Sequence, residues 1–188
     1  AILLITISFK DSMASVLSIK KISDVPTYQM TYHGDHALDE YLKQGADSSD
    51  ELQDFITNNL ANGAGKLLVG KHGCSAFYGT TPDGDIIFAR NFDAPDSEGC
   101  ILKTDATEGS KILGVSNMGW LVKEPKGKLT FTDKMNMIAA PYMVLDGMNE
   151  YGLAVAVFRA GDTQYTKDEG KISIYDHTVP IVVLNKAK

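Results

Sequence analysis

One stretch of the sequence, GCSAFYGTTPDGDIIFARNFD, constrains the fold more than any other. Two apolar segments, CSAFYGT and DIIFAR, flank Asp83-Gly84, a dipeptide that supplies the positive φ of a two-residue hairpin turn. A turn centred there places Cys74 opposite about residue 93 on the returning strand. The sequence therefore predicts that Cys74, Arg90 and Asp93 converge at the open end of one β-hairpin.

The composition is that of a single globular domain. The chain has 188 residues, a hydrophobic fraction of 44% and a formal net charge of -6, and a domain of this length can bury a sizeable core. The acidic balance argues against nucleic acid and anionic membranes as partners, because both require a basic face. The two cysteines, Cys74 and Cys100, allow at most one disulfide, which excludes a disulfide framework and a four-cysteine zinc site.

The N-terminal run AILLITISF is too short to span a bilayer, which takes roughly 20 residues. It suits either a first β-strand or the remnant of a signal peptide, whose apolar region runs to about 7 to 15 residues. The localisation therefore stays open between the cytoplasm and a secreted or cell-envelope protein.

The N-terminal part of the chain is predicted to contain two strands followed by helices. ASVLSIKKI and PTYQMTY, within residues 14–32, flank the breaker SDVP and indicate two strands. ALDEYLKQG predicts a short helix closed by Gly45. Ser48 and Glu51 form a capping-box pattern, and apolar residues then recur at helical spacing until Asn62-Gly63.

After Gly63 the sequence becomes rich in strand signals. We expect strands in KLLVG, CSAFYGT, DIIFAR, KILGVSN, KLTFT, MNMIAAPYMVL and LAVAVF, and a second turn in NEYG, at Asn149 to Gly152. The chain thus divides into a helical segment, residues 1–73, and a sheet-rich segment, residues 74–188. The last apolar run, TVPIVVLNKAK, has no helix-stopping residue, so we expect the native product to continue further.

The residues gathered by the hairpin suggest that Cys74 is a nucleophile. A thiol attacks as its thiolate, which Arg90 would favour, while Asp93 would position a basic partner. If the Gly73–Cys74 peptide bond is broken, the new α-amino group, with a reference pKa of about 7.7 to 8.0, can act as the base. Gly73 has no Cβ, so its carbonyl is open to attack by the thiol.

GCSAFYGTTPDGDIIFARNFD followed by DGMNEYGLAVAV resembles the N-terminal-nucleophile amidases of the choloylglycine hydrolase family, which includes penicillin V acylase relatives, and the acid ceramidase-like amidases. In that superfamily the mature chain begins with Cys and carries Arg and Asp 16 and 19 residues further on, which is the spacing of Arg90 and Asp93 from Cys74. DGMNEYG sits in the relative place of the family's Asn-Glu-x-Gly turn. The resemblance therefore implies an active-site role for Glu150, with Asn149 as a candidate beside it.

The resemblance implies an α+β fold, specifically a four-layer αββα sandwich, with autoproteolysis at Gly73–Cys74 and hydrolysis of a linear amide. No cofactor and no metal are implied. Residues 1–73 would be a propeptide whose helices cover the substrate cleft, and this propeptide can remain associated after the cut. Candidate small-molecule substrates are bile salts, penicillin V, N-acyl homoserine lactones and N-acyl amino acids. Family members often assemble as homo-oligomers.

The sequence also departs from the family pattern. Arg159 stands where bile-salt-hydrolysing members carry an oxyanion-binding Asn, which argues against bile-salt specificity and makes Arg159 a candidate for contact with the substrate or its oxyanion. The family's later Asn and Arg catalytic positions would lie beyond Lys188. These departures favour a second interpretation, a non-catalytic binding or interaction module with an uncut linker and Cys74 as a remnant.

Other candidates have ordinary structural interpretations. The pattern His33-Gly-Asp-His36 has too few ligands to specify a metal site. His72 is either a proton carrier during processing or a solvated loop residue. Cys100 is expected to be structural. The aromatic residues Trp120, Tyr142 and Tyr151 line either an acyl pocket or the core.

Overall fold

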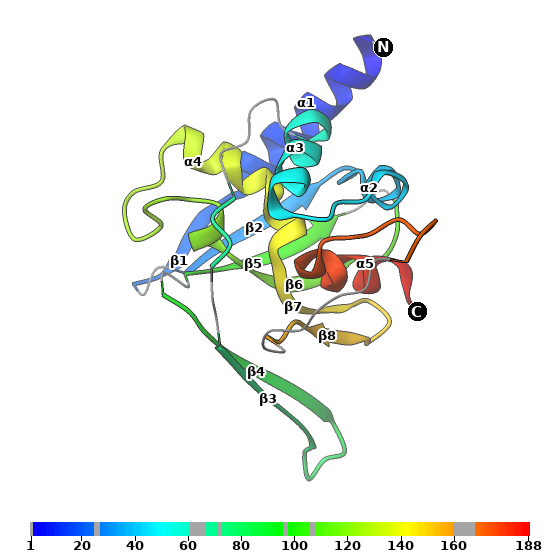
Figure 1. Cartoon of the computed structure of the whole chain (residues 1–188). Coiled ribbons are helices and arrows are strands. Elements are labelled where there is room, and N and C mark those ends of the chain that lie inside the picture. The colour runs from blue at the N-terminus through cyan, green and yellow to red at the C-terminus, as the bar shows by residue number, and fades with distance from the viewer. Residues whose placement is uncertain are drawn as a thin grey trace.

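The computed structural model describes residues 2–24, 27–60, 67–70, 73–95, 98–105, 108–159 and 168–188, with the backbone alone for residues 2–8. The chain is a mixed α+β structure with a six-stranded sheet, a separate two-stranded hairpin and several helices (Figure 1). In chain order the elements are α1 (Ile2–Ser18), β1 (Lys20–Ser23), β2 (Thr27–His33), α2 (Leu38–Gln44), α3 (Ser49–Asn59), β3 (Gly73–Thr80), β4 (Ile86–Asp93), β5 (Gly99–Asp105), β6 (Ile112–Asn117), η1 (Met118–Trp120), α4 (Phe131–Asn136), η2 (Met137–Met143), β7 (Val144–Asn149), β8 (Ala154–Ala156), η3 (Asp176–Thr178) and α5 (Val179–Lys186), where η marks a 3-10 helix.

The six-stranded sheet joins the two segments of the chain. Its strand order is β1-β2-β5-β6-β7-β8, and all neighbours are antiparallel except β2 and β5, which are parallel. The β2–β5 register runs from Tyr28 opposite Cys100 to His33 opposite Asp105. A strand from residues 1–73 is therefore an internal strand of the sheet formed mainly by residues 74–188.

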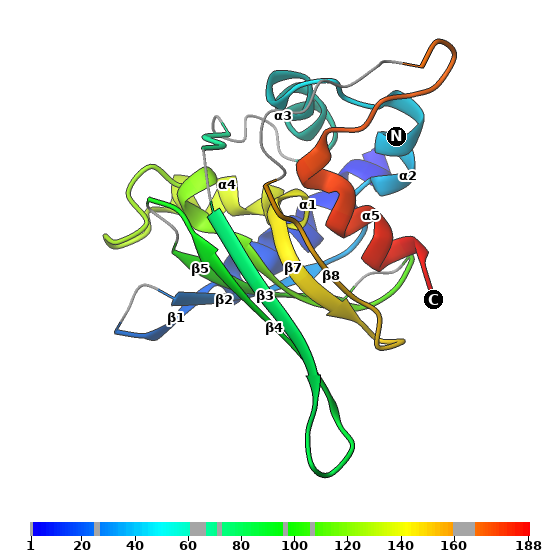
Figure 2. The same cartoon turned by 60° about the horizontal axis from the view of Figure 1, so that its bottom comes forward.

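The helices lie on one side of the six-stranded sheet, and the β3–β4 hairpin starts on the other side and projects away from it (Figures 1 and 2). The core between helices and sheet draws on both segments. Tyr41 of α2 packs edge-on against Phe55 of α3 and Tyr142 of η2, with ring centroids 5.2 and 5.3 Å apart. All three side chains are fully buried, so residues 1–73 and 74–188 share one hydrophobic core.

Both predicted helices after residue 33 are confirmed. Helix α2 ends at Gly45, whose φ of 75° is favourable only for a residue without Cβ, and the Gly45 N–H donates to the carbonyl of Tyr41. Helix α3 begins after Ser48, whose side chain accepts the N–H of Glu51 at 3.2 Å. The Glu51 carboxylate accepts the N–H of Asp47. The expected stop at Asn62-Gly63 lies outside the described residues.

The prediction for residues 14–32 is partly wrong. Helix α1 extends to Ser18, so Ala14–Ser18 is helical, and the first of the two strands is only Lys20–Ser23. Helix α1 is attached to β2 through its serines: Thr31 N–H donates to Ser18 Oγ at 2.9 Å and His33 N–H donates to Ser15 Oγ at 2.8 Å. These contacts form between distant residues, so β-branched composition alone could not predict them.

The N-terminal run AILLITISF belongs to helix α1 from Ile2 onward, so the first of its two predicted alternatives, a β-strand, is wrong, and the second, a signal-peptide remnant, stays a prediction. Within the described part of the chain, no helix combines the length and the apolar character needed to cross a membrane.

The strand-rich region contains more helix than its composition suggests. The segments CSAFYGT, DIIFAR, KILGVSN and LAVAVF overlap β3, β4, β6 and β8, as predicted, whereas β5 is a strand that the sequence does not predict. KLTFT runs into α4, because Thr130 and Asp133 form a reciprocal capping box. Most of MNMIAAPYMVL is the 3-10 helix η2, which contains Pro141, and only its end enters β7. Residues 67–70 form no strand.

Candidate functional site

The β3–β4 hairpin has a longer turn than the sequence predicts. Its strands pair from Gly73 opposite Asp93 to Thr80 opposite Ile86, and the Thr81 N–H donates to the carbonyl of Asp85 at 2.8 Å. The turn therefore contains three residues, Pro82 to Gly84, with Gly84 at a φ of 91°. The extra residue moves the register by one position, so Cys74 lies opposite Phe92 and not opposite residue 93.

This register separates Asp93 from the other two predicted residues. Side chains alternate between the faces of a strand, so Cys74, Arg90 and Phe92 share the face turned to the six-stranded sheet, and Asp93 points from the other face. Phe92 contacts the ring of Trp120, with centroids 5.8 Å apart. Asp93 is exposed, and its Oδ1 accepts the side-chain amide of Asn91 at 2.9 Å.

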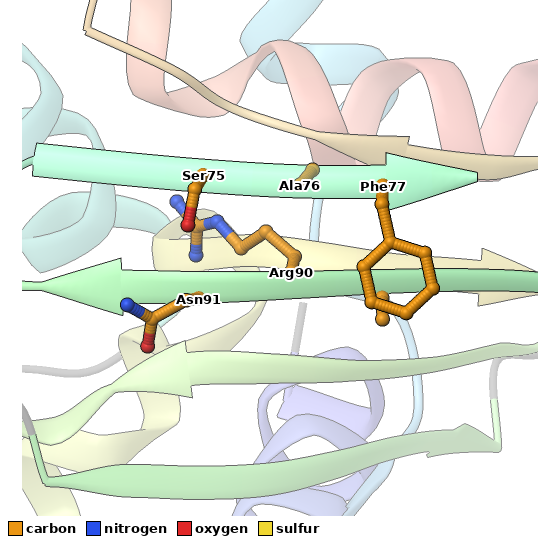
Figure 3. A pocket seen from close by; sticks show the side chains of 6 residues that line it. Ser75, Ala76, Phe77, Arg90 and Asn91 are labelled. Carbon is orange, nitrogen blue, oxygen red and sulfur yellow. The ribbon is translucent and has the colours of Figure 1, made fainter.

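Arg90 and Cys74 are in direct contact, as the hairpin argument predicts. Arg90 Nη2 donates to Cys74 Sγ at 3.1 Å and to the carbonyl oxygen of Val157 at 2.8 Å. The Arg90 guanidinium also lies over the ring of Phe92, 4.7 Å from its centroid. Figure 3 shows the Arg90 side chain extending back along the hairpin towards Ser75, the residue after Cys74. A buried cation beside a sulfur stabilises the negative charge of a thiolate.

Asp146, at the third position of β7, completes this arrangement and was not singled out from the sequence. Its Oδ2 accepts Arg90 Nη1 at 3.0 Å, with 2% of the Arg90 side chain and 23% of the Asp146 side chain exposed. Burial raises the pKa of Asp146, and the Arg90 charge offsets part of that rise. A carboxylate inside the apolar strand VLDGM is a signal that could have identified it, because a half-buried charge needs a partner.

The bond predicted to be cut lies at the open end of the hairpin. Gly73 is exposed and pairs with Asp93, and a Cβ placed on Gly73 would lie 3.7 Å from the Cβ of Asp93. Asp93 is thus beside the Gly73–Cys74 bond, although its side chain does not share a face with the Cys74 thiol. His72 lies outside the described residues.

Asn149 and Glu150 lie away from Cys74, in the β7–β8 turn. Asn149 is 4% exposed, and both ends of its side-chain amide are hydrogen-bonded: Nδ2 donates to the carbonyls of Leu184 and Ala187, and Oδ1 accepts the N–H groups of Tyr151 and Leu153. Glu150 Oε1 accepts the N–H of Lys111 at 2.9 Å. Glu150 follows the last residue of β7 and is four residues along the chain from Asp146, about 13 Å at the rise of a β-strand.

The remaining candidates differ in how far they are buried. Arg159 is exposed and lies two residues beyond Val157. Trp120 and Tyr142 are buried in the core, whereas Tyr151 is 54% exposed. Cys100 is fully buried, and burial raises the pKa of its thiol to about 12. The two cysteines therefore differ sharply in environment.

His33 and His36, which the sequence does not predict to bind a metal, lie in different environments. His33 Nδ1 lies 3.6 Å from Asp105 Oδ2 on the sheet, while His36 is 1% exposed and packs edge-on against Tyr32. Among the described residues no group of three His, Cys, Asp or Glu side chains could hold a metal ion.

Two cavities flank the hairpin. One of about 330 Å³ is lined by Ser75, Ala76, Phe77, Ala89, Arg90 and Asn91. A second of about 290 Å³ lies between Phe88 of the hairpin and the sheet, and Asp146, Met148 and Ala154 are among its lining residues. Asp146, which binds Arg90, is thus shared between this second cavity and the Arg90–Cys74 contact, although neither Arg90 nor Cys74 is among the cavity's described lining residues.

The comparisons with known proteins add no assignment: no family model, no curated protein and no solved structure matches this chain.

Proposed function

We propose that this chain is an autoprocessed cysteine amidase, activated by cleavage of the Gly73–Cys74 bond and acting on a linear non-peptide amide. The observation that carries the proposal is the contact of 3.1 Å between Arg90 Nη2 and Cys74 Sγ, with Arg90 held in turn by Asp146. A thiol beside a fixed, buried cation is in the environment that a nucleophilic cysteine needs. The spacing of Cys74, Arg90 and Asp93 in the sequence supports the same proposal.

Cleavage would begin with attack by Cys74 Sγ on the carbonyl carbon of Gly73. The carbon–nitrogen bond between the two residues breaks, the thiol proton goes to the departing nitrogen, and a thioester forms. Water then hydrolyses the thioester, which leaves a carboxylate on Gly73 and both a thiol and an α-amino group on Cys74. Asp93, opposite Gly73 in the hairpin, would hold the new ammonium group by its charge.

Turnover would use the same atoms on a bound amide. The α-amino group of Cys74 takes the thiol proton and delivers it to the leaving nitrogen, and water then releases the acyl group from the sulfur. Before the cut the Cys74 nitrogen is an amide and cannot act as this base, so the uncut chain would be inactive. The acyl group would enter the apolar cavity beside Asp146.

The proposal carries a fold expectation finer than mixed α+β. In a four-layer αββα sandwich, a second sheet would cover the face of the six-stranded sheet from which the hairpin starts. That face is apolar and open: Leu113 and Met148 on it are 52% and 44% exposed, and Phe77 and Tyr78 on the hairpin are 63% and 70% exposed. These exposures are consistent with a further layer.

The test is the intact mass, under denaturing conditions, of the wild-type protein, Cys74→Ala and Cys100→Ala, each incubated from acid to neutral pH. We expect fragments that meet at Gly73–Cys74 in the wild type and in Cys100→Ala, and none in Cys74→Ala. An amide-substrate screen on the cut protein would follow. A wild type that stays intact under every condition would overturn the proposal.

The rival function is a binding module with an uncut linker, and Arg159 is the residue that favours it. In that case Cys74→Ala would keep both the intact mass and the ligand affinity of the wild type. Alkylation separates the two functions further, since only an amidase loses its activity when Cys74 is modified.

A further inference from the structure

Strand β1 and the chain around α4 lie at one edge of the molecule (Figure 1). Residues of β1 and of the loop that precedes α4 line a basic hollow. Its volume is about 430 Å³. The described residues that line it are Ile19, Lys21, Tyr28, Lys126, Gly127, Lys128, Leu129 and Lys134. Four of these are lysines, although the chain as a whole has a net charge of -6.

The lysines come together only in the folded chain. Lys126, Lys128 and Lys134 belong to the sequence KEPKGKLTFTDK, whereas Lys21 is contributed by β1, more than a hundred residues earlier. Two contacts hold these walls in place: Tyr28 Oη donates to the carbonyl of Gly127 at 3.2 Å, and Lys134 Nζ donates to the carbonyl of Ile19 at 3.4 Å. The hollow is therefore a fixed feature of the fold.

The positive charge of the hollow is only partly balanced. None of the described lining residues is acidic. Glu98 lies 3.5 Å from Lys126, and Asp133 is engaged with the N–H and hydroxyl of Thr130. Within the described part of the chain, Lys21 and Lys128 form no ion pair. Four ammonium groups gathered around one hollow create a positive local potential that attracts an anion.

The shape and the lining indicate the class of ligand. Ile19 and Tyr28 are 4% and 6% exposed and form an apolar floor, while the lysines stand around it. Lysine ammonium groups bind phosphate oxygens as point charges, and a cavity of this size suits a small organic molecule. We propose that this hollow binds a phosphate-bearing ligand, either a soluble phosphate ester or the headgroup of an anionic phospholipid.

The site is independent of the Cys74 chemistry, so its test does not require an active enzyme. The full-length Cys74→Ala protein is titrated with pyrophosphate by calorimetry at low and at high ionic strength. The test variant is Lys21→Gln/Lys128→Gln, and the matched control is Lys10→Gln/Lys43→Gln, which removes the same net charge from exposed positions on α1 and α2. Thermal unfolding of both variants checks that the fold is kept.

We expect pyrophosphate to bind the parent protein more weakly as salt rises, and the test variant to bind about tenfold more weakly than the control. Vesicles of phosphatidylglycerol and of phosphatidylcholine distinguish the two sources of phosphate. Binding to phosphatidylglycerol alone, lost in the test variant, indicates a lipid headgroup, whereas pyrophosphate binding without vesicle binding indicates a soluble ester. The proposal would be overturned if the test and control variants lost the same affinity for pyrophosphate, or if the parent protein bound neither pyrophosphate nor phosphatidylglycerol vesicles.

Discussion

Asp146 holds Arg90 in place against Cys74, which is the more exposed of the two cysteines. The Arg90 guanidinium donates to Asp146 Oδ2 at 3.0 Å through Nη1 and to Cys74 Sγ at 3.1 Å through Nη2. The two nitrogens of one planar group thus connect a carboxylate on the six-stranded sheet with a thiol on the hairpin. Because the guanidinium is rigid, its orientation at Asp146 determines its orientation at the sulfur.

Replacing Asp146 by Asn should affect both the thiol and the stability. Asn removes the counter-charge of a guanidinium that is only 2% exposed, so we expect a loss of about 2 to 3 kcal/mol in the free energy of unfolding, below the value for a fully buried pair because Asp146 itself is partly exposed. Loss of the fixed Arg90 orientation should slow alkylation of Cys74 by iodoacetamide roughly fivefold, which corresponds to about 1 kcal/mol. The control is Asp105→Asn, which alters an exposed carboxylate paired with His33. Equal alkylation rates in both variants would contradict the positioning role of Asp146.

Arg90→Gln should have a pH-dependent effect, because it leaves the Asp146 carboxylate half-buried without its cation. We expect the free energy of unfolding to fall by about 2 to 3 kcal/mol at neutral pH, which is less than for a fully buried ion pair because part of Asp146 is exposed. Without Arg90 the folded-state pKa of Asp146 rises further, so the folded chain binds a proton more readily than the unfolded chain. The variant should therefore regain stability relative to the wild type as the pH falls through that raised pKa towards the ordinary range of Asp. Urea denaturation of both proteins from acid to neutral pH measures this difference, and a difference independent of pH would contradict it.

Local sequence signals predict α2, α3 and the β3–β4 hairpin, because a residue at the end of each element determines where it starts, stops or turns. Gly45 ends α2, Ser48 caps the start of α3, and Gly84 lies in the hairpin turn. The capping pair Thr130 and Asp133 is an equally local signal for α4, and it outweighs the β-branched composition of KLTFT, which by itself predicts a strand. Strand β5 could not be predicted in this way. Its short sequence pairs with β2 in parallel, and that pairing depends on contacts some seventy residues apart.

The site shows the same division. The contact between Cys74 and Arg90 followed from a hairpin, which is a local structure. The side of the hairpin on which Asp93 lies could not be predicted in the same way, because one extra turn residue moves a side chain to the opposite face of a strand. Asp146 and the Val157 carbonyl come from β7 and the chain after β8, so only the packing of the hairpin on the sheet brings them to Arg90.

Asn149 should behave as a structural residue. Asn149→Ala removes two donated hydrogen bonds that tie the β7–β8 turn to the end of α5 and two accepted hydrogen bonds within the turn, so we expect a loss of about 3 kcal/mol in the free energy of unfolding. Glu150→Gln, at the next residue, is the matched control. Its amide oxygen can still accept the Lys111 N–H, so the free energy of unfolding should fall by less than about 0.5 kcal/mol. Chemical denaturation measures both. A stable Asn149→Ala protein with slowed alkylation of Cys74 would instead place Asn149 in the site.

Cleavage at Gly73–Cys74 should not release residues 1–73. Strand β2 of this segment pairs with β5 over six consecutive positions, and Tyr142 Oη of the other segment donates to the carbonyl of His36 at 2.7 Å. Met30, Tyr41 and Phe55 are fully buried in the shared core, so separation would expose several large apolar side chains at about 25 cal/mol per Å². The cut protein, or residues 1–73 and 74–188 expressed together, should elute from a native sizing column at the volume of uncut Cys74→Ala and separate only in denaturant. Elution of residues 74–188 as a folded species alone would show that the N-terminal segment is a detachable propeptide.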